Sequence, residues 1–523
     1  MARGGAAAAE QLRIAEAALA AGRFPEAAEA LQKTVRLDPD SLRPRLMLAY
    51  ALWQSEQREQ AILVLRRLIE RSPGNADAWF NLGNFYRAER QFEDAVRAFA
   101  RAAQLQPGNA AARVNLAYVL VQSGRFDEAE ASVRSALEIF PDEPDLLVNL
   151  AQIRRATQRF EEALATLDRC IALASQHPGY RVTRALVLLD LGEQKRALAE
   201  LDGVIRNHPE AADAHFARAQ LLLSIGRHAE GWREYLWRPP RARWLAAEGR
   251  PFATATPSLG SLRGKPVVIC GEQGLGDVLF FLRFAPLVER LAASLHLDVE
   301  ARLQAILPAR WAAPPGPDAI RILAGDLGAI VGGEVVPSLR LEPPASRIGR
   351  ARERLARCGP PPYLGLTWQG GQRWEDMTEP GATLFKRVAP EALGGALRQS
   401  RATLISMQRN PAPRDLASLA SAAGRPAHDF SDVNDDLAAA LAALSLLDDY
   451  VAVSNTNVHL RDSLAKPTRA LVTQPAEWRW GISGERSAWL THALLYRQAG
   501  DGAWDGALAR LQADMAVPSV DRG

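Results

Sequence analysis

The sequence lacks most features that mark secreted, membrane-spanning and metal-binding proteins. It has only three cysteines, Cys170, Cys270 and Cys358, and their wide spacing fits neither a disulfide framework nor a metal-ligand motif. No run approaches the ~20 apolar residues that a membrane-spanning helix needs. The alanine-rich N-terminal segment carries charges and has no apolar core of a signal peptide. We therefore expect a cytoplasmic protein without a membrane span.

The chain also has little excess charge of either sign. Its 63 Lys and Arg residues nearly balance its 60 Asp and Glu residues, which leaves a net charge of +3. This gives no case for nucleic-acid binding through bulk electrostatics. Without a metal motif, we expect no metal ion and no cofactor. The abundance of alanine, arginine and leucine suits a GC-rich bacterial genome.

What the sequence has instead is a regular period through its first half. Prolines recur at intervals of 34 residues and then of 37 and 31, at Pro39, Pro73, Pro107, Pro141, Pro178 and Pro209. A small residue recurs in step with them, at Ala27, Ala61, Ala95, Ala129, Ala163, Ala197 and Gly231. Small residues suit the contact between two antiparallel helices, and proline ends the second helix of each unit. The pattern resembles tetratricopeptide repeats (TPRs) and predicts six repeats and a degenerate seventh.

A TPR array forms a superhelix with a groove that holds a peptide or protein. Three asparagines share one repeat position, and a fourth lies nearby, so we predict an acceptor groove lined by Asn81, Asn84, Asn115 and Asn149. Two alternatives remain open. The asparagines could cap contacts between repeats, and the array could serve as a spacing arm or a homodimer interface.

The second half changes to short apolar runs that alternate with helical ones, which predicts parallel sheets in two doubly wound lobes. We place the array at 1–237, a linker at 238–264, an N-terminal Rossmann-like lobe at 265–350, a C-terminal Rossmann-like lobe at 351–515 and a tail at 516–523. Ligands of such sheets bind at the carboxyl ends of the strands. The predicted fold is therefore a helical solenoid followed by a two-lobed α/β domain.

A glycine-rich loop follows the first predicted strand of the α/β region. Its spacing, with Gly271, Gly274 and Gly276, does not match the dinucleotide fingerprint, and no Lys-Ser/Thr pair follows as in a phosphate loop. Asp277 falls in the first turn of the next helix, where the helix dipole favours its charged form. Two interpretations of Asp277 remain open: it is either a catalytic base or a helix cap.

Two further clusters are candidates for binding a diphosphate or a sugar. Backbone amides at Gly370 and Gly371 can meet a phosphate, and Lys386 can place a positive charge beside it. Gln408 lies in the LISMQRN segment that ends another strand. For Lys386 the alternative is a solvated surface lysine.

A later strand ends in a polar segment that begins a helix. Asn455, Thr456 and Asn457 offer hydroxyl and amide groups at this helix N-terminus, and His459 lies in its first turn. Trp480 belongs to a tryptophan-rich loop and could stack on a base or sugar. The alternatives are a structural histidine and simple core packing of the loop.

Four segments in this order, GEQGLGDVLFFLRFAPLV, GLTWQGG, LISMQRN and SNTNVHLRDSLAKP, resemble the glycosyltransferase domain that bacteria fuse to TPRs. That domain is similar to lipopolysaccharide heptosyltransferases, and the whole plan resembles O-GlcNAc transferase. The resemblance implies a GT-B fold. It also implies a nucleotide-sugar in the C-terminal lobe, an acceptor toward the N-terminal lobe and metal-independent inverting transfer.

Residue by residue, the resemblance gives Asp277 the role of general base and Lys386 a contact with the diphosphate. The heptosyltransferase pattern Asp-Thr-x-x-x-His-Leu corresponds to the segment from Asn455 to Leu460 with two departures. Asn455 replaces the acid, and the segment is one residue shorter. These departures concern the donor contact and leave the donor sugar open.

Three functions follow from these patterns. The leading hypothesis is a protein glycosyltransferase whose repeats hold a polypeptide acceptor such as flagellin. The second is a non-catalytic TPR scaffold with a degenerate transferase fold, which the Asn455 departure favours. The third is a transferase that acts on a saccharide or lipid-linked acceptor.

Overall fold

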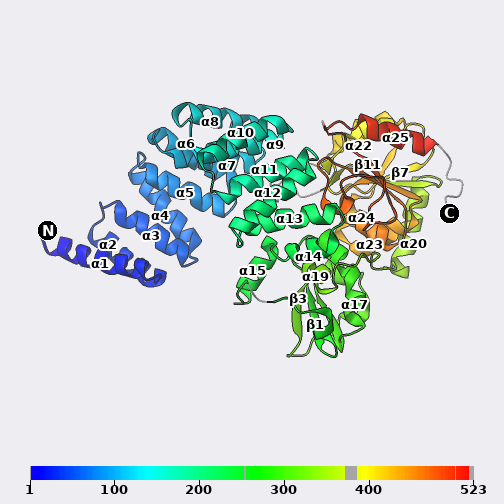
Figure 1. Cartoon of the computed structure of the whole chain (residues 1–523), viewed down its shortest axis with the longest axis horizontal. Helices are drawn as coiled ribbons and strands as arrows, with labels where there is room; N and C mark the ends of the chain where they lie inside the picture. Colours follow the sequence, from blue (N-terminus) through cyan, green and yellow to red (C-terminus); the bar gives the residue numbers. More distant parts are fainter. Residues whose placement is uncertain (1, 253–254, 371–385, 501, 517–523) are drawn as a thin grey trace. The chain divides into compact units, whose positions relative to one another are not determined.

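The computed structural model describes residues 2–252, 255–370, 386–500 and 502–516 (Figure 1). Its contacts divide the chain into two compact units. The first ends at Tyr180, and the second comprises the described residues from Arg181 onward.

The first unit consists of consecutive helices that form five pairs and the start of a sixth. Their bounds are α1 (Ala2–Ala20), α2 (Phe24–Leu37), α3 (Arg43–Gln54), α4 (Arg58–Arg71), α5 (Ala76–Ala88), α6 (Phe92–Leu105), α7 (Ala110–Gln122), α8 (Phe126–Ile139), α9 (Pro144–Ala156), α10 (Phe160–Leu173) and α11 (Pro178–Asp190). The repeating small residues of the even-numbered helices have no exposed surface, namely Ala27, Ala61, Ala95, Ala129 and Ala163. The predicted TPR array is confirmed.

Packing within a pair explains the residue classes of the repeat. A Cβ atom added to Gly83 of α5 would lie 2.8 Å from the ring of Phe99 in α6, so only glycine allows this helix contact. Odd-numbered helices also pack on one another, α3 against α5 and α7 against α9. The odd-numbered helices therefore line the inner face of the array.

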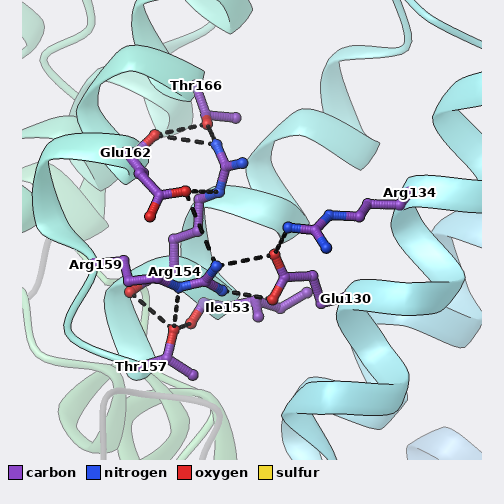
Figure 2. A network of polar contacts seen from close by, with 8 residues as sticks. All are labelled: Glu130, Arg134, Ile153, Arg154, Thr157, Arg159, Glu162 and Thr166. Atoms are coloured by element: carbon purple, nitrogen blue, oxygen red, sulfur yellow. Dashed lines mark hydrogen bonds and ion pairs between the residues drawn. The ribbon is translucent and has the colours of Figure 1, made fainter.

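Ion pairs form a polar network within and between two neighbouring repeats of the array (Figure 2). The carboxylate of Glu130 in α8 accepts bonds from Arg134, at 2.7 Å, and from Arg159 before α10, at 2.5 Å. Arg154 in α9 lies 3.4 Å from Glu162 in α10. Partly exposed pairs of this kind contribute about 0–1 kcal/mol each, so the buried helix contacts contribute more to the stability of the array.

The last helices of the array belong to the second unit. They are α12 (Gln194–Asn207), α13 (Ala212–Ser224) and α14 (His228–Tyr235), so α13 and α14 form the seventh pair. A Cβ atom on Gly231 would lie 2.7 Å from Leu223, which explains the small residue at this position. Trp232 of α14 is fully buried, and a Cβ atom on Gly328 of the α/β region would lie 2.3 Å from its ring. The seventh pair is thus part of the α/β core, and the repeat boundary at residue 237 stays a prediction.

The segment after the array, which we predict as a linker at 238–264, contains a helix. Helix α14 ends at Tyr235, and Pro239 begins a further helix, α15 (Pro239–Ala247), because proline is accepted in a first helical turn. Arg238 has no exposed surface, and its Nη2 atom donates to Glu272 at 2.6 Å and to Asp326 at 2.5 Å. These ion pairs fix the end of the array to the smaller sheet.

The smaller sheet has three parallel strands in the order β2-β1-β3: β1 (Pro266–Cys270), β2 (Ser294–Asp298) and β3 (Ile320–Leu323). The single helix predicted after β1 is broken into α16 (Leu275–Phe281), the 3-10 turn η2 (Leu282–Phe284) and α17 (Ala285–Glu289). Pro286 has no N–H group to continue the earlier helix. Short elements complete this region: η1 (Leu259–Leu262), α18 (Ala301–Gln304), η3 (Ala309–Trp311), η4 (Ala324–Asp326) and α19 (Leu327–Ile330).

The larger sheet has six parallel strands in the order β11-β10-β9-β4-β7-β8. Their bounds are β4 (Tyr363–Thr367), β7 (Thr403–Ser406), β8 (Ala427–Asp429), β9 (Asp449–Val453), β10 (Thr468–Val472) and β11 (Ala493–Arg497). Numbered from β4, this is the 3-2-1-4-5-6 order of a doubly wound sheet. A small antiparallel ribbon pairs β5 (Gln369–Gly370) with β6 (Lys386–Arg387).

Helices connect these strands: α20 (Ala345–Cys358), α21 (Pro390–Ala396), α22 (Pro413–Ala423), α23 (Leu437–Leu446), α24 (Thr456–Ser463) and α25 (Asp505–Ala516), with 3-10 turns η6 (Ser431–Asp435) and η7 (Trp478–Trp480). One continuous apolar core includes Trp232 of α14, Phe280 of α16 and Tyr450 of β9. The prediction of a helical array followed by an α/β region with parallel sheets is confirmed. The two-lobed GT-B arrangement is more specific than this description, and it stays a prediction.

Candidate functional site

The larger sheet has a switch point between β4 and β9, where the strand order reverses. In doubly wound sheets, ligands bind in the crevice at the carboxyl ends of such strands. Gly370 lies just beyond β4, and a Cβ atom there would come within 2.2 Å of the carbonyl oxygen of Ser454, just beyond β9. The predicted residues Gly370 and Asn455 therefore lie close together at the switch point, because the segments after β4 and β9 approach too closely for any side chain at position 370. Gly371 lies outside the described residues.

Several predicted donor residues are already hydrogen-bonded within the protein. The Oε1 atom of Gln408 accepts from the backbone N–H groups of Trp368, at 3.1 Å, and Gln369, at 2.9 Å. The side chain of Asn455 caps α24 by accepting from Val458 N at 3.2 Å. These two side chains hold the backbone in place, Gln408 just beyond β4 and Asn455 at the start of α24.

The next two residues open helix α24. Asn457 donates to Asn434 Oδ1 at 3.1 Å, so its amide also serves the protein's own structure. Thr456 begins the helix and is partly exposed. Its backbone lies beside the glycine loop, since a Cβ atom on Gly276 would be 3.4 Å from Thr456 Cα. The glycine loop and the start of α24 are therefore neighbours.

Lys386 lies beside the switch point, because strand β6 pairs it with Gly370 of β5. Its Nζ atom lies 2.6 Å from Oε1 of Glu477, and the indole Nε1 of Trp480 donates to Oε2 of Glu477 at 3.1 Å. Burial opposes ionisation of Glu477, but the charges of Lys386 and Arg479 outweigh it and lower its pKa to about 2. Lys386 is thus an ion-paired, mostly buried side chain.

Trp480 is only 2% exposed and packs in the apolar core. Its indole ring therefore presents no open face for a base or sugar, and the packing alternative fits its position. The N–H group of the same ring still helps to hold the carboxylate of Glu477, to which it donates a hydrogen bond.

Asp277 extends from the first turn of α16, whose N-cap residue is Gly274. Its Oδ1 atom accepts from Nη2 of Arg479 at 2.5 Å. The Arg479 guanidinium in turn stacks on Trp478, with 4.5 Å from Cζ to the ring centroid, and on Phe280, with 4.7 Å. Asp277 is therefore held by an ion pair, and 36% of its side-chain surface is exposed.

His459 is buried beside the glycine loop. A Cβ atom on Gly276 would lie 3.2 Å from its ring. Burial, together with the charges of Arg479 and Arg283, lowers the pKa of His459 to about 3. His459 is neutral at physiological pH, and within the described chain its Nδ1 atom has no hydrogen-bond partner.

Two ion pairs hold four charges of this cluster, Asp277 with Arg479 and Glu477 with Lys386. The nearby Arg283 is buried and donates to carbonyl and hydroxyl oxygens of the protein itself. A neutral His459 adds nothing to the sum. A nucleoside diphosphate needs surplus positive charge or free donors around its phosphates. The cluster provides no such surplus unless one of the pairs opens.

Two residues of this cluster, Glu477 and Arg479, have no role in the sequence-based site. The only signal for them is the EWRW segment itself, in which charges alternate with tryptophans in a loop. Their partners lie 91 and 202 residues away, so the pairings depend on the fold.

The asparagines predicted to line the groove of the array differ in their surroundings. Asn149 is 5% exposed and donates to the carbonyl of Val114 at 3.1 Å, which links α9 to α7. Asn115 accepts from Arg87 at 2.6 Å. Asn81 and Asn84 are half-buried. Asn115 and Asn149 thus make contacts between repeats, as in the capping alternative.

A surface depression adjoins the ribbon strand β6. It contains none of the predicted site residues and is lined by Arg387, Ala389, Pro390, Glu391, Arg414, Asp415 and Ser418. In the described part of the chain, no three His, Cys, Asp or Glu side chains are grouped as metal ligands. None of the described helices is long and apolar enough to cross a membrane.

Comparisons with known proteins identify the class of the N-terminal region. A TPR family described as the C-terminal domain of cilia and flagella-associated protein 70 matches residues 1–221. The N-terminal region is a TPR array, and this match ends before the α/β region. No curated protein matches the chain.

Similar solved structures are TPR proteins with low identity. A TPR protein from Parabacteroides merdae is 15% identical, with a TM-score of 0.41, and the match covers 44% of this chain and 91% of that one. PilF of Pseudomonas aeruginosa is 18% identical (TM-score 0.34; 40% and 96% covered). YrrB, described as a TPR protein with an unusual peptide-binding site, is 20% identical (TM-score 0.30; 36% and 96% covered).

Proposed function

We propose that this protein is a scaffold whose TPR array binds a polypeptide. The observation that carries the proposal is the run of consecutive repeat pairs, in which odd-numbered helices pack on one another, α3 on α5 and α7 on α9. Solenoids use such concave surfaces to hold extended partners. The charge-neutral cluster in the α/β unit also favours a scaffold over an enzyme, because it holds its candidate base and cation in internal ion pairs.

The inner face of α3, α5 and α7 carries aromatic and cationic groups suited to peptide contact. Tyr50 is 48% exposed, and Trp53 stacks on Phe85 with 4.2 Å between ring centroids. The Arg87 guanidinium lies 5.8 Å from the ring of Tyr118 on the next odd helix. Rigid aromatic side chains and arginine contribute strongly to protein interfaces.

This function is tested with peptides selected from a random library against the full chain. The variants Tyr50→Ala and Arg87→Ala should weaken binding of the selected peptides at least tenfold by calorimetry. The matched control is Arg97→Ala, which removes an exposed arginine from the even-numbered helix α6. If both inner-face variants bind as tightly as the control, the groove does not hold the peptide.

A second candidate function is glycosyl transfer from a nucleotide-sugar to that polypeptide, or to a saccharide or lipid-linked acceptor. The 3-2-1-4-5-6 strand order favours it, because the predicted donor residues Gly370, Lys386 and Thr456 adjoin its switch point. Asp277 would serve as the base once Arg479 releases it. Thermal shift against UDP-, GDP-, ADP- and CMP-sugars tests this function, since a bound nucleotide-sugar stabilises the fold. No shift with any of them would contradict it.

A further inference from the structure

The carboxylate of Glu477 lies where donors converge at the switch point of the larger sheet. It accepts from the ammonium of Lys386 at 2.6 Å and from the indole of Trp480 at 3.1 Å. Ser454 directly follows β9, and Lys386 is paired with Gly370 directly beyond β4. One carboxylate thus accepts from two donors near the carboxyl ends of the two central strands.

These donors are the kind that bind a phosphate group. Lysine provides a point charge for phosphate oxygens, and an indole group donates a single hydrogen bond to them. A carboxylate and a phosphate present the same acceptor chemistry to such donors. Glu477 therefore satisfies, from within the chain, the groups that a phosphate would otherwise engage.

We propose that Glu477 is an internal occupant of a diphosphate-binding site and that a nucleoside diphosphate binds by displacing it from Lys386. The proposal rests on the second candidate function, the binding of a nucleotide-sugar. It explains how the cluster gains the positive charge it lacks, because displacement of Glu477 leaves the charge of Lys386 free for the ligand. Glu477 thus determines which anions the site accepts, namely those that can compete with a tethered carboxylate.

The same movement reaches Asp277. Glu477 and Arg479 flank Trp478, and the turn η7 spans Trp478–Trp480. Displacement of Glu477 shifts this turn and with it the Arg479 guanidinium that holds Asp277 at 2.5 Å. Binding of the diphosphate therefore also loosens the ion pair of the candidate base.

The test compares full-length Glu477→Gln with the wild type, using inorganic pyrophosphate, UDP, GDP, ADP and CDP as probes in calorimetry at low salt. Glutamine keeps the shape of the side chain and removes its charge. We expect at least one probe to bind Glu477→Gln tenfold or more tightly than the wild type, and Lys386→Met to abolish binding in both backgrounds. Glu485→Gln, an acid with a 67% exposed side chain, is the matched control and should leave affinity unchanged.

A second readout follows the bond between Trp480 and Glu477. Displacement of Glu477 by a bound probe should change tryptophan emission in the wild type, and Trp480→Phe should remove that change. If Glu477→Gln folds poorly by circular dichroism, Glu477→Asp replaces it. Aspartate shortens the reach to Lys386, and it should give an affinity between those expected for wild type and Glu477→Gln.

The outcomes separate this inference from the function on which it rests. Wild-type binding that Glu477→Gln does not strengthen would overturn the internal occupant and leave nucleotide binding intact. If neither protein binds any probe, both the inference and the transferase function fail, and the peptide scaffold remains. Binding by Glu477→Gln alone would support the inference and show that the free chain is closed to these anions.

Discussion

His459 shows how a single buried residue makes stability depend on pH. Its pKa is about 3 in the folded chain and about 6.5 in an unfolded one. Below pH 6.5 the unfolded state therefore binds a proton that the folded state does not. Stability contributed by neutral His459 is present above this pH and is lost as the pH falls toward 3.

We predict that His459 alone lowers the free energy of unfolding of the wild type by about 1.4 kcal/mol for each unit that the pH falls between pH 6 and pH 4. Urea unfolding of the full chain, followed by near-ultraviolet circular dichroism, measures the loss. The variant His459→Gln should show a smaller loss over the same range, while His208→Gln, on the array, should follow the wild type. Parallel curves for wild type and His459→Gln would contradict the prediction.

At the scale of elements, the contact between β5 and the end of β9 leaves no space for a side chain. A Cβ atom at Gly370 would lie 2.2 Å from a backbone oxygen, whereas a Cβ atom at Gly395 in α21 meets nothing within 4 Å. The two glycines therefore form a matched pair for substitution to alanine.

We expect Gly370→Ala to lower the free energy of unfolding by about 1–3 kcal/mol, because the strand ends must separate to admit the methyl group. Gly395→Ala should be neutral or stabilise by up to about 1 kcal/mol, since alanine favours the helix. Thermal unfolding of both variants measures the difference. Equal melting temperatures would mean that the β5 contact yields without cost.

Sequence periodicity predicts elements well where local spacing determines them. The 34-residue spacing of Ala61 and Ala95 encodes helix pairs directly, and alternating apolar runs encode parallel strands. The break in the helix after β1 depends on Pro286 and on packing, and a helical pattern alone does not reveal it. The ion pair between Asp277 and Arg479 joins residues 202 positions apart, so no local pattern could identify it.

At the scale of the whole molecule, the contacts place the boundary between units near Tyr180, within the array. Helices α12 to α14 therefore belong to the folding unit that contains both sheets. A chain that begins after Arg238 would lose Trp232 from the apolar core, and it would also leave Glu272 and Asp326 without the buried arginine that neutralises them. Removing one partner of a buried ion pair typically costs about 3–5 kcal/mol.

We predict that a chain comprising residues 181–523 folds cooperatively, whereas one comprising residues 239–523 does not. Denaturant unfolding and near-ultraviolet circular dichroism distinguish the two products. The double variant Trp232→Ala, Arg238→Met in residues 181–523 should reproduce part of the loss. A cooperative transition in residues 239–523 would show that the α/β region does not depend on the last repeats.

The burial of Trp232 against Gly328 also constrains how this protein can change over generations. Duplication or deletion of a repeat within the first 180 residues leaves the contacts within the second unit intact. A duplication that replaces the seventh pair would have to reproduce both Trp232 and Arg238. The number of repeats is thus free to drift at one end of the array and fixed at the other.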